Sequence, residues 1–515
     1  MALVSNPRHS LPQRGPVVPA FGRVKSLVRT SSVMRRLRRR KSSGALSLNG
    51  TSEHAVEAPR IETFVSTAIG SGLLDDPITH LICANQSTRP LLMGRCSEQG
   101  IVSCPRCQLV KYCSERCQKQ HWTRHRTTCA HPYLEDTWQP GWVLQDRPPS
   151  FACASTSFSP SLFISPVFDV LREQTLDCDF KLCFPACIDI RNLIETVNNL
   201  PLGYRGRFDV LLNTSDPITA NRNLVILYAL LHPLDPEPST DKVAALAVHL
   251  MYSSALTSPG AAYLKRCLDD IYGSQYEGDN FSFRISLGIR GKGKIHSLQT
   301  ITGTKQPREM FNSTYGLAQA LRSQRRVLDA PENTDHWDRF LSRLKPSHRM
   351  AFKRFRDTGV LAPFSADTSH FTHPNRYSRF SSFHVTKSYL MPYKNSSLMF
   401  SAKGEWLGRA DFNPFQGWDA TAVQESGHRI ASINSADIFS CLFFHLKSEF
   451  QRFISQVENL NLNFVLTQYD PHILSKGISA GIVPIFEGAC FDRIDTRDMM
   501  DDIGINSCLA DWGPC

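Results

Sequence analysis

The chain has 515 residues, of which 41% are hydrophobic, so it is long enough for two or three domains with a sizeable buried core. No apolar run reaches the roughly 18 residues that a membrane-spanning helix needs; the longest, Leu224 to Leu231, is typical of a core helix. The formal net charge is +11, but residues 1–50 alone hold nine Arg and two Lys without any Asp or Glu. The remaining residues are therefore formally neutral, which argues against a body that binds nucleic acid.

Residues 1–60 are rich in Pro, Ser and Arg and offer little to bury, which predicts a basic, disordered tail. The cluster from Arg35 to Lys41 fits a nuclear import signal, a kinase site or a tether to an anionic surface; a merely solvated tail is the alternative. An Arg- and Ser-rich start also fits a mitochondrial transit peptide. Because no secretory segment is present, we expect an intracellular protein of the cytoplasm or nucleus with free thiols, and mitochondrial targeting stays open.

Seven of the sixteen cysteines lie within 47 residues, a density that chance clustering does not explain. Six potential ligands follow one spacing, Cys104-x2-Cys107-x5-Cys113-x3-Cys117-x7-His125-x3-Cys129. Thiolates and imidazole at such intervals are what tetrahedral zinc needs, and the metal replaces a hydrophobic core that is too small to form. The spacing therefore predicts a structural zinc module.

The run from Cys104 to Cys129 closely resembles a MYND zinc finger. The resemblance implies two zinc ions in an interleaved cross-brace. One ion would be held by Cys104, Cys107, His125 and Cys129, and the other by Cys113, Cys117 and an upstream pair. His121 is a rival ligand, but the family's Trp-x2-His spacing, Trp122 to His125 here, favours His125.

The upstream pair is irregular. Cys96 suits the second cysteine of the family's opening pair, but Met93 occupies its partner's position and is a poor zinc ligand. We predict that Cys83 and Cys96 pair across an insertion from Gln86 to Arg95. The alternative is a site with three protein ligands, completed by water or His80.

The same resemblance implies a binding surface. In family members that bind short proline-containing peptides, a Gln after the sixth cysteine and a Trp four residues later make the contact, and these positions are Gln118 and Trp122 here. An aromatic face packs well against Pro-rich segments, whose ordering cost is low. The alternative is that Trp122 only packs the core of the finger.

After a connector from Trp138 to Pro149, strands and helices alternate. We predict strands at 180–186 and 208–212, a helix capped by Asp189, and a long helix opened by Asp216 and Pro217. Further helices are expected at 240–256 and 261–271. Strand–helix–strand–helix order is typical of a parallel α/β unit.

The C-terminal part repeats this pattern. Residues 332–360 are expected to be helical and 361–427 rich in loops. Ser435 is expected to cap a helix through Phe450, and strands are predicted at 463–467, 482–486 and 491–495. The predicted fold is therefore a Rossmann-like α/β body with a small cross-brace zinc finger. The predicted domains are residues 80–131, 150–330 and 331–515. The alternative is that the last two form one body.

Most of residues 80–515 also resemble a known group of proteins, although more loosely. The segments 189–201, 213–223, 491–495 and 509–514 are similar to a domain of unknown function and its continuation in fungal MYND-containing proteins. That domain also occurs at the N-terminus of dynein-arm assembly factors. Such fungal proteins usually run on beyond the position of Cys515, so whether the chain is truncated there stays open. The resemblance implies no established activity.

Two cofactor motifs are incomplete. A nucleotide or S-adenosylmethionine site needs a Gly-rich turn after the first strand, and Ile188 stands in that turn. The segment Gly288 to Lys294 satisfies G-x4-G-K, but Ile295 follows where a P-loop needs Ser or Thr, so a basic turn is predicted.

No catalytic residue was identified. The sequence favours a zinc-binding interaction or scaffold protein, whose finger binds a protein partner through a proline-containing peptide, without membrane or nucleic acid. The alternative is a Rossmann-like S-adenosylmethionine-dependent methyltransferase that the finger targets. A third interpretation, which the neutral body disfavours, is nucleic-acid binding through the basic tail and the finger's Arg and Lys residues.

Overall fold

The structure, a computed structural model, describes residues 74, 78–86, 96–150, 166–172, 177–201, 203–233, 238–273, 282–376, 400–401, 403–406, 413–483, 486, 490–496 and 499–513. The basic tail and residues 87–95 of the predicted insertion lie outside this part of the chain. Among the described residues, no helix is long and apolar enough to cross a membrane.

A six-stranded sheet organises the α/β region, with its strands in the order β10-β3-β4-β9-β7-β6. The strands are β3 (Phe180–Phe184), β4 (Arg207–Asn213), β6 (Ser282–Gly288), β7 (Lys294–Thr300), β9 (Asn461–Thr467) and β10 (Arg493–Ile494). Every neighbouring pair is parallel except β6 with β7. The sheet is therefore mostly parallel, which confirms the mixed α/β class.

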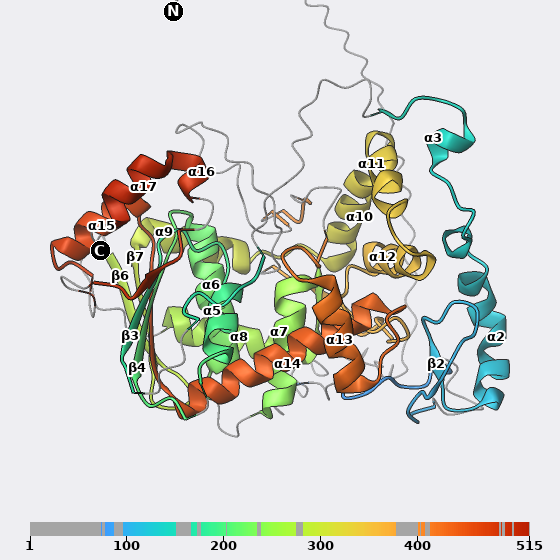
Figure 1. The fold of residues 1–515 in the computed structure, drawn as a ribbon, viewed down its shortest axis with the longest axis horizontal. Helices are drawn as coiled ribbons and strands as arrows, with labels where there is room; N and C mark the ends of the chain where they lie inside the picture. The colour runs from blue at the N-terminus through green and yellow to red at the C-terminus, as the bar shows by residue number, and fades with distance from the viewer. Residues whose placement is uncertain are drawn as a thin grey trace, which may run out of the picture. The chain divides into compact units, whose positions relative to one another are not determined.

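Helices cover both faces of this sheet (Figure 1). Because side chains alternate along a strand, Leu182 and Val210 pack on one face beneath α5 (Arg191–Asn198), α6 (Pro217–Leu231) and α14 (Ile438–Asn459). Cys183 and Leu211 point to the other face, towards α15 (Pro471–Ser479), α16 (Met499–Ile503) and α17 (Ile505–Trp512).

One of the three predicted helix N-caps is confirmed, and two were placed at the wrong residue. Asp216 caps α6 as predicted, because its carboxylate accepts from the backbone N–H groups of Ile218 and Thr219. Asp189 lies one residue before the cap of α5, although it accepts from the backbone N–H of Arg191. The cap of α14 is Asp437, not Ser435.

The other helices of the body are α7 (Thr240–Tyr252), α8 (Ser258–Gly273), α9 (Ile301–Phe311), α10 (Leu317–Leu328), α11 (Pro331–Leu341), α12 (Pro346–Thr358) and α13 (Ala420–Ala431). Before the body lie a short 3-10 helix (Pro132–Leu134) and α3 (Gly141–Leu144). The predicted helix at 240–256 ends early, because residues 255–257 form β5 (Ala255–Thr257), which pairs with β8 (Phe371–Pro374). The described residues of the strand predicted at 482–486 do not form one. The strand predicted at 491–495 is the short β10.

The order of the strands departs from a simple alternating unit. β9 comes more than 150 residues after β7 in the chain, yet it inserts between β4 and β7. This order is not the 3-2-1-4-5-6 order of a dinucleotide-binding sheet, so a Rossmann-like fold is not established. Gly288 to Lys294 joins antiparallel β6 and β7, and Ile295 lies fully buried in β7.

Candidate metal centre

The candidate zinc ligands from Cys104 onward lie on or beside a short hairpin and one helix, and Cys83 and Cys96 lie in the segment before the hairpin. β1 (Val102–Ser103) pairs with β2 (Lys111–Tyr112), and α2 (Glu115–Cys129) follows. Between the strands, the N–H of Gln108 donates to the carbonyl of Cys104, and Gln108 takes the left-handed conformation at φ 58°. This tight turn brings Cys104 and Cys107 together. Ser114 caps α2, because its side chain accepts from the N–H of Cys117.

One group of four ligands is closed off from solvent. It consists of Cys104, Cys107, His125 and Cys129, all of them buried. The Nε2 of His125 lies 3.4 Å from the sulfurs of both Cys104 and Cys107, and the sulfurs of Cys104 and Cys129 are 3.8 Å apart. With Zn–S of about 2.3 Å and Zn–N of about 2.0 Å, tetrahedral zinc requires ligand separations of about 3.5–3.8 Å. The donor set fits one zinc ion.

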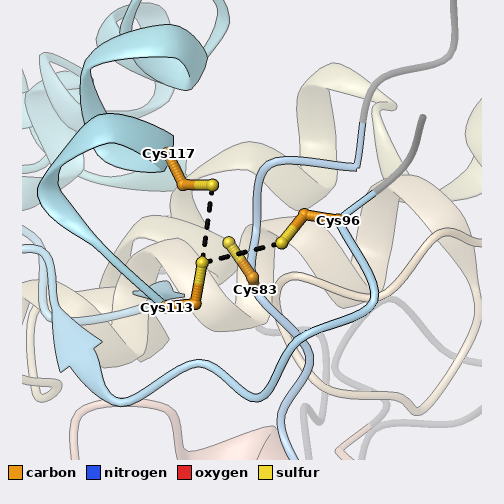
Figure 2. A group of neighbouring side chains, drawn as sticks. All are labelled: Cys83, Cys96, Cys113 and Cys117. Carbon is orange, nitrogen blue, oxygen red and sulfur yellow. Dashed lines mark hydrogen bonds between the residues drawn. The ribbon is translucent and has the colours of Figure 1, made fainter. Parts of the chain in front are cut away.

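The other group consists of Cys83, Cys96, Cys113 and Cys117, whose side chains point toward one another (Figure 2). The sulfur of Cys113 lies 3.6 Å from that of Cys96 and 3.5 Å from that of Cys117. Cys83 and Cys96 thus meet although residues 84–95 separate them in the sequence. The side chain of His80 pairs with Thr79 and is not part of the group.

Close packing couples the protonation of these thiols. A hydrogen bond from Cys107 lowers the pKa of Cys104 to about 3, while the same contact and burial raise the pKa of Cys107 far above its usual range. Burial also raises the pKa of Cys83 to about 12. A bound zinc ion removes this conflict because it favours the thiolate form of every ligand.

Sequence reasoning treated His121 as a rival ligand and missed its neighbour Tyr112. The hydroxyl of Tyr112, which is fully buried, lies 3.1 Å from the Nδ1 of His121. The His121 ring stacks on His125, with ring centroids 5.8 Å apart. Burial lowers the pKa of His121. His121 therefore supports the orientation of the ligand His125 from outside the cluster.

Comparison with known families agrees with this geometry. Residues 83–129 match the family model of the MYND finger. Residues 83–129 form a MYND finger. Residues 163–256 match a family described as a domain of unknown function (DUF4470). The two clusters are the zinc-binding groups of the finger's cross-brace, consistent with two zinc ions.

The curated relatives resemble only a small part of the chain. Over 90 residues, the chain is 29% identical to Histone-lysine N-methyltransferase SMYD3 of Mus musculus, covering 15% of this chain and 21% of the relative. The Homo sapiens protein of the same name is 27% identical over 89 residues, covering 14% and 20%. The chain thus spans about a fifth of these relatives, in the MYND region, so a methyltransferase role is not supported. No solved structure matches.

The two residues of the implied peptide surface lie one turn apart on α2. Trp122 is 46% exposed, and its ring contacts the ring of His125 edge-on with centroids 6.2 Å apart. Gln118 is half-buried. Trp122 is therefore anchored beside a zinc ligand while nearly half of the residue remains accessible.

The finger also contacts the α/β body. The Nζ of Lys111 donates to the carbonyl of Ser432 at 2.7 Å, and the amide of Asn434 donates to the side chain of Gln108 at 3.2 Å. Before the finger, the carbonyl of Ile78 accepts from Lys447 of α14. Buried residues of finger and body belong to one continuous core cluster.

A buried polar network closes the sheet at the carboxyl ends of β4 and β9. The helices after these strands, α6 and α15, lie on opposite faces, so this is the switch point where open α/β sheets usually bind ligands. The side chain of Asn213, fully buried, donates to the carbonyls of Pro185 and Tyr469. It accepts from the hydroxyl of Thr467 at 2.8 Å. Asn213 thereby ties together the loops that follow three strands.

Proposed function

We propose that this protein is a zinc-dependent interaction or scaffold protein, whose MYND finger binds a short proline-containing peptide of a protein partner. The proposal rests on the half-exposed Trp122. A Trp that only filled the finger's core would be buried, as Tyr112 is. An aromatic ring held in place by its contact with His125 offers a rigid surface for a proline ring.

The polar neighbour of Trp122 supports the same assignment. Gln118 lies one turn before Trp122 on α2, so both side chains face the same side of the helix. A Gln amide can both donate to and accept from a peptide backbone. Trp122 would therefore provide the apolar contact with proline, and Gln118 would fix the register of the peptide.

The body would then serve as the scaffold. Its resemblance to fungal MYND-containing proteins and to the N-terminal domain of dynein-arm assembly factors supports an assembly role in the cytoplasm or nucleus. In this proposal the protein acts by binding, and the eight ligands Cys83, Cys96, Cys104, Cys107, Cys113, Cys117, His125 and Cys129 serve only to fold the binding surface.

Fluorescence polarisation with labelled peptides tests this proposal. Peptides that contain paired prolines, and matched peptides with Ala in place of Pro, would be titrated with the wild type and with Trp122→Ala. We expect Trp122→Ala to weaken binding of the Pro-containing peptides at least tenfold, with the zinc content unchanged. Leu509→Ala, which removes a similarly exposed apolar side chain from the body, is the control and should leave binding unchanged.

Equal binding of the Pro and Ala peptides would contradict the proline specificity. Unchanged affinity of Trp122→Ala would show that Trp122 does not form the peptide site.

A further inference from the structure

Arg222 carries a buried guanidinium group whose donors are mostly unused. The residue lies in the second turn of α6 and is only 1% exposed. Its Nη2 donates to the carbonyl of Ile188 at 2.6 Å and to the side-chain oxygen of Asn223 at 2.8 Å. Its Nε and Nη1 have no hydrogen-bond partner in the part of the chain that the structure describes. Most of its five N–H donors therefore lack an acceptor.

Among the residues that the structure describes, no carboxylate forms an ion pair with Arg222 either. Burial lowers its pKa to about 10, so the side chain remains protonated at neutral pH. Asp216 is near, but both of its carboxylate oxygens accept from the first turn of α6. Arg191, the other buried arginine here, differs because it forms an ion pair with Asp189. A buried, unpaired charge is costly, so a second group is needed to offset it.

The position of Arg222 suggests how such a group could reach it. Ile188, whose carbonyl accepts from Arg222, lies in the turn that follows β3, and Arg222 lies in the helix that follows β4. This is the edge of the sheet where the parallel strands end, and β4 also borders the switch point between β4 and β9. Ile188 is only half-buried. The guanidinium is therefore bonded to a turn residue that reaches the surface.

We propose that Arg222 forms the floor of an anion site that binds a phosphate group, entering between the turns after β3 and β4. Guanidinium and phosphate are complementary in charge and in hydrogen bonding. A phosphate offers more acceptor oxygens than a carboxylate, which suits the several free donors of Arg222. A buried water molecule could accept from these donors, but it would leave the charge uncompensated.

Inorganic phosphate is the probe that tests this site. Thermal unfolding of the full chain would be followed in phosphate and in chloride at equal ionic strength, with acetate as the carboxylate comparison. Saturating phosphate should raise the Tm of the wild type by roughly 2–5 °C, because it binds only the folded state. Calorimetric titration should show one saturable phosphate site per chain. A smaller effect of acetate is expected.

Variants locate the effect. Arg222→Gln removes the unpaired charge, so it should be at least as stable as the wild type in chloride, less stable in phosphate, and insensitive to phosphate. Arg222→Lys keeps the charge with fewer donors and should show a reduced shift. Arg290→Gln is the control: Arg290 is also buried, but it has the carboxylate of Glu458 at 3.3 Å, so its phosphate shift should remain.

Three outcomes would overturn the proposal. The first is a wild type without saturable phosphate binding, which needs no variant to interpret. The second is an equal phosphate shift in the wild type and in Arg222→Lys or Arg222→Gln, because the anion would then bind elsewhere. The third is an equal response to acetate, which would assign the site to carboxylates.

Discussion

The fold of the finger and the fold of the α/β body are stabilised by different interactions. In α2 of the finger, the buried residues are His125 and Cys129, both of which belong to the buried group of four candidate zinc ligands. In α6 of the body, every residue from Ile218 to Leu231 is buried, and most of them are apolar. The finger therefore depends on metal coordination, whereas the body depends on the area of apolar surface that it removes from water.

The finger and the body are also in direct contact with each other. Lys111 and Gln108 of the finger's hairpin contact the segment between α13 and α14. Buried residues of the finger and of the body also belong to one continuous core cluster. Because the metal supplies most of the folding free energy of the finger, loss of zinc should unfold the finger first and affect the body less.

The largest effect is expected from Cys107→Ala. Structural zinc supplies roughly 10 kcal/mol or more of folding free energy per site, and Cys107 belongs to the fully buried cluster. We expect loss of this zinc ion and proteolytic cleavage confined to residues 80–131, with the helices of the body retained. Metal analysis and limited proteolysis with mass spectrometry would measure both.

Cys508→Ala is the matched control, because Cys508 is equally buried but belongs to the core between the sheet and α17. It should lower the stability of the body and keep both zinc ions. Unfolding of the whole molecule by Cys107→Ala would show that finger and body form one cooperative unit.

Cys83→Ala should have a smaller effect. Cys96, Cys113 and Cys117 remain and are partly exposed, so water can complete a weakened site. We expect the wild type to hold two zinc ions and the variant to hold one after dialysis against a mild chelator. A wild type with one zinc ion would show that Cys83 and Cys96 do not close the first site.

The finger was the most predictable part of the molecule, because its ligands are close in sequence and zinc permits few spacings. The pairing of Cys83 with Cys96 could be predicted only from the resemblance, since Met93 occupies the usual position. The contact of Tyr112 with His121 was missed, because no spacing rule specifies which groups orient a ligand from outside.

In the body, strands and helices were predictable where the signal is local, as with the cap formed by Asp216 and Pro217. The place of β9 between β4 and β7 was not, because pairing between strands so distant in the chain leaves no local pattern. The cap of α14 was placed two residues early, since Ser435 and Asp437 are both good capping residues.

The contact between the connector and the body should make the free energy of unfolding depend on pH. Asp335 of α11 accepts from both terminal nitrogens of Arg147 at 2.7 Å and from the N–H of Ser150. The hydrogen bond from Arg147 is the main reason why the pKa of Asp335 is lowered to about 2. The stabilisation is therefore present above the unfolded-state pKa near 4 and is lost as the pH falls toward 2.

Asp335→Asn should accordingly lower the free energy of unfolding by about 1 kcal/mol at pH 7, since exposure of Arg147 screens the pair. The difference from the wild type should shrink at pH 3. Urea titrations at both pH values measure it, and Asp357→Asn, at an exposed ion pair within α12, is the control. An equal loss at both pH values would assign the effect to packing.

The smallest effect should come from the contacts that join the two regions. Lys111 donates a charged hydrogen bond to the carbonyl of Ser432, and Gln108 accepts from Asn434, but both finger residues lie partly exposed to solvent. The double variant Lys111→Met and Gln108→Ala should therefore lower the free energy of unfolding by at most about 1 kcal/mol and leave the zinc content unchanged. The measurement that tests these contacts is hydrogen exchange of α13 and α14. Removal of zinc should speed this exchange in the wild type and much less in the variant. If α14 responds equally in both proteins, the coupling runs through the shared apolar core, and the finger is a structural part of the body.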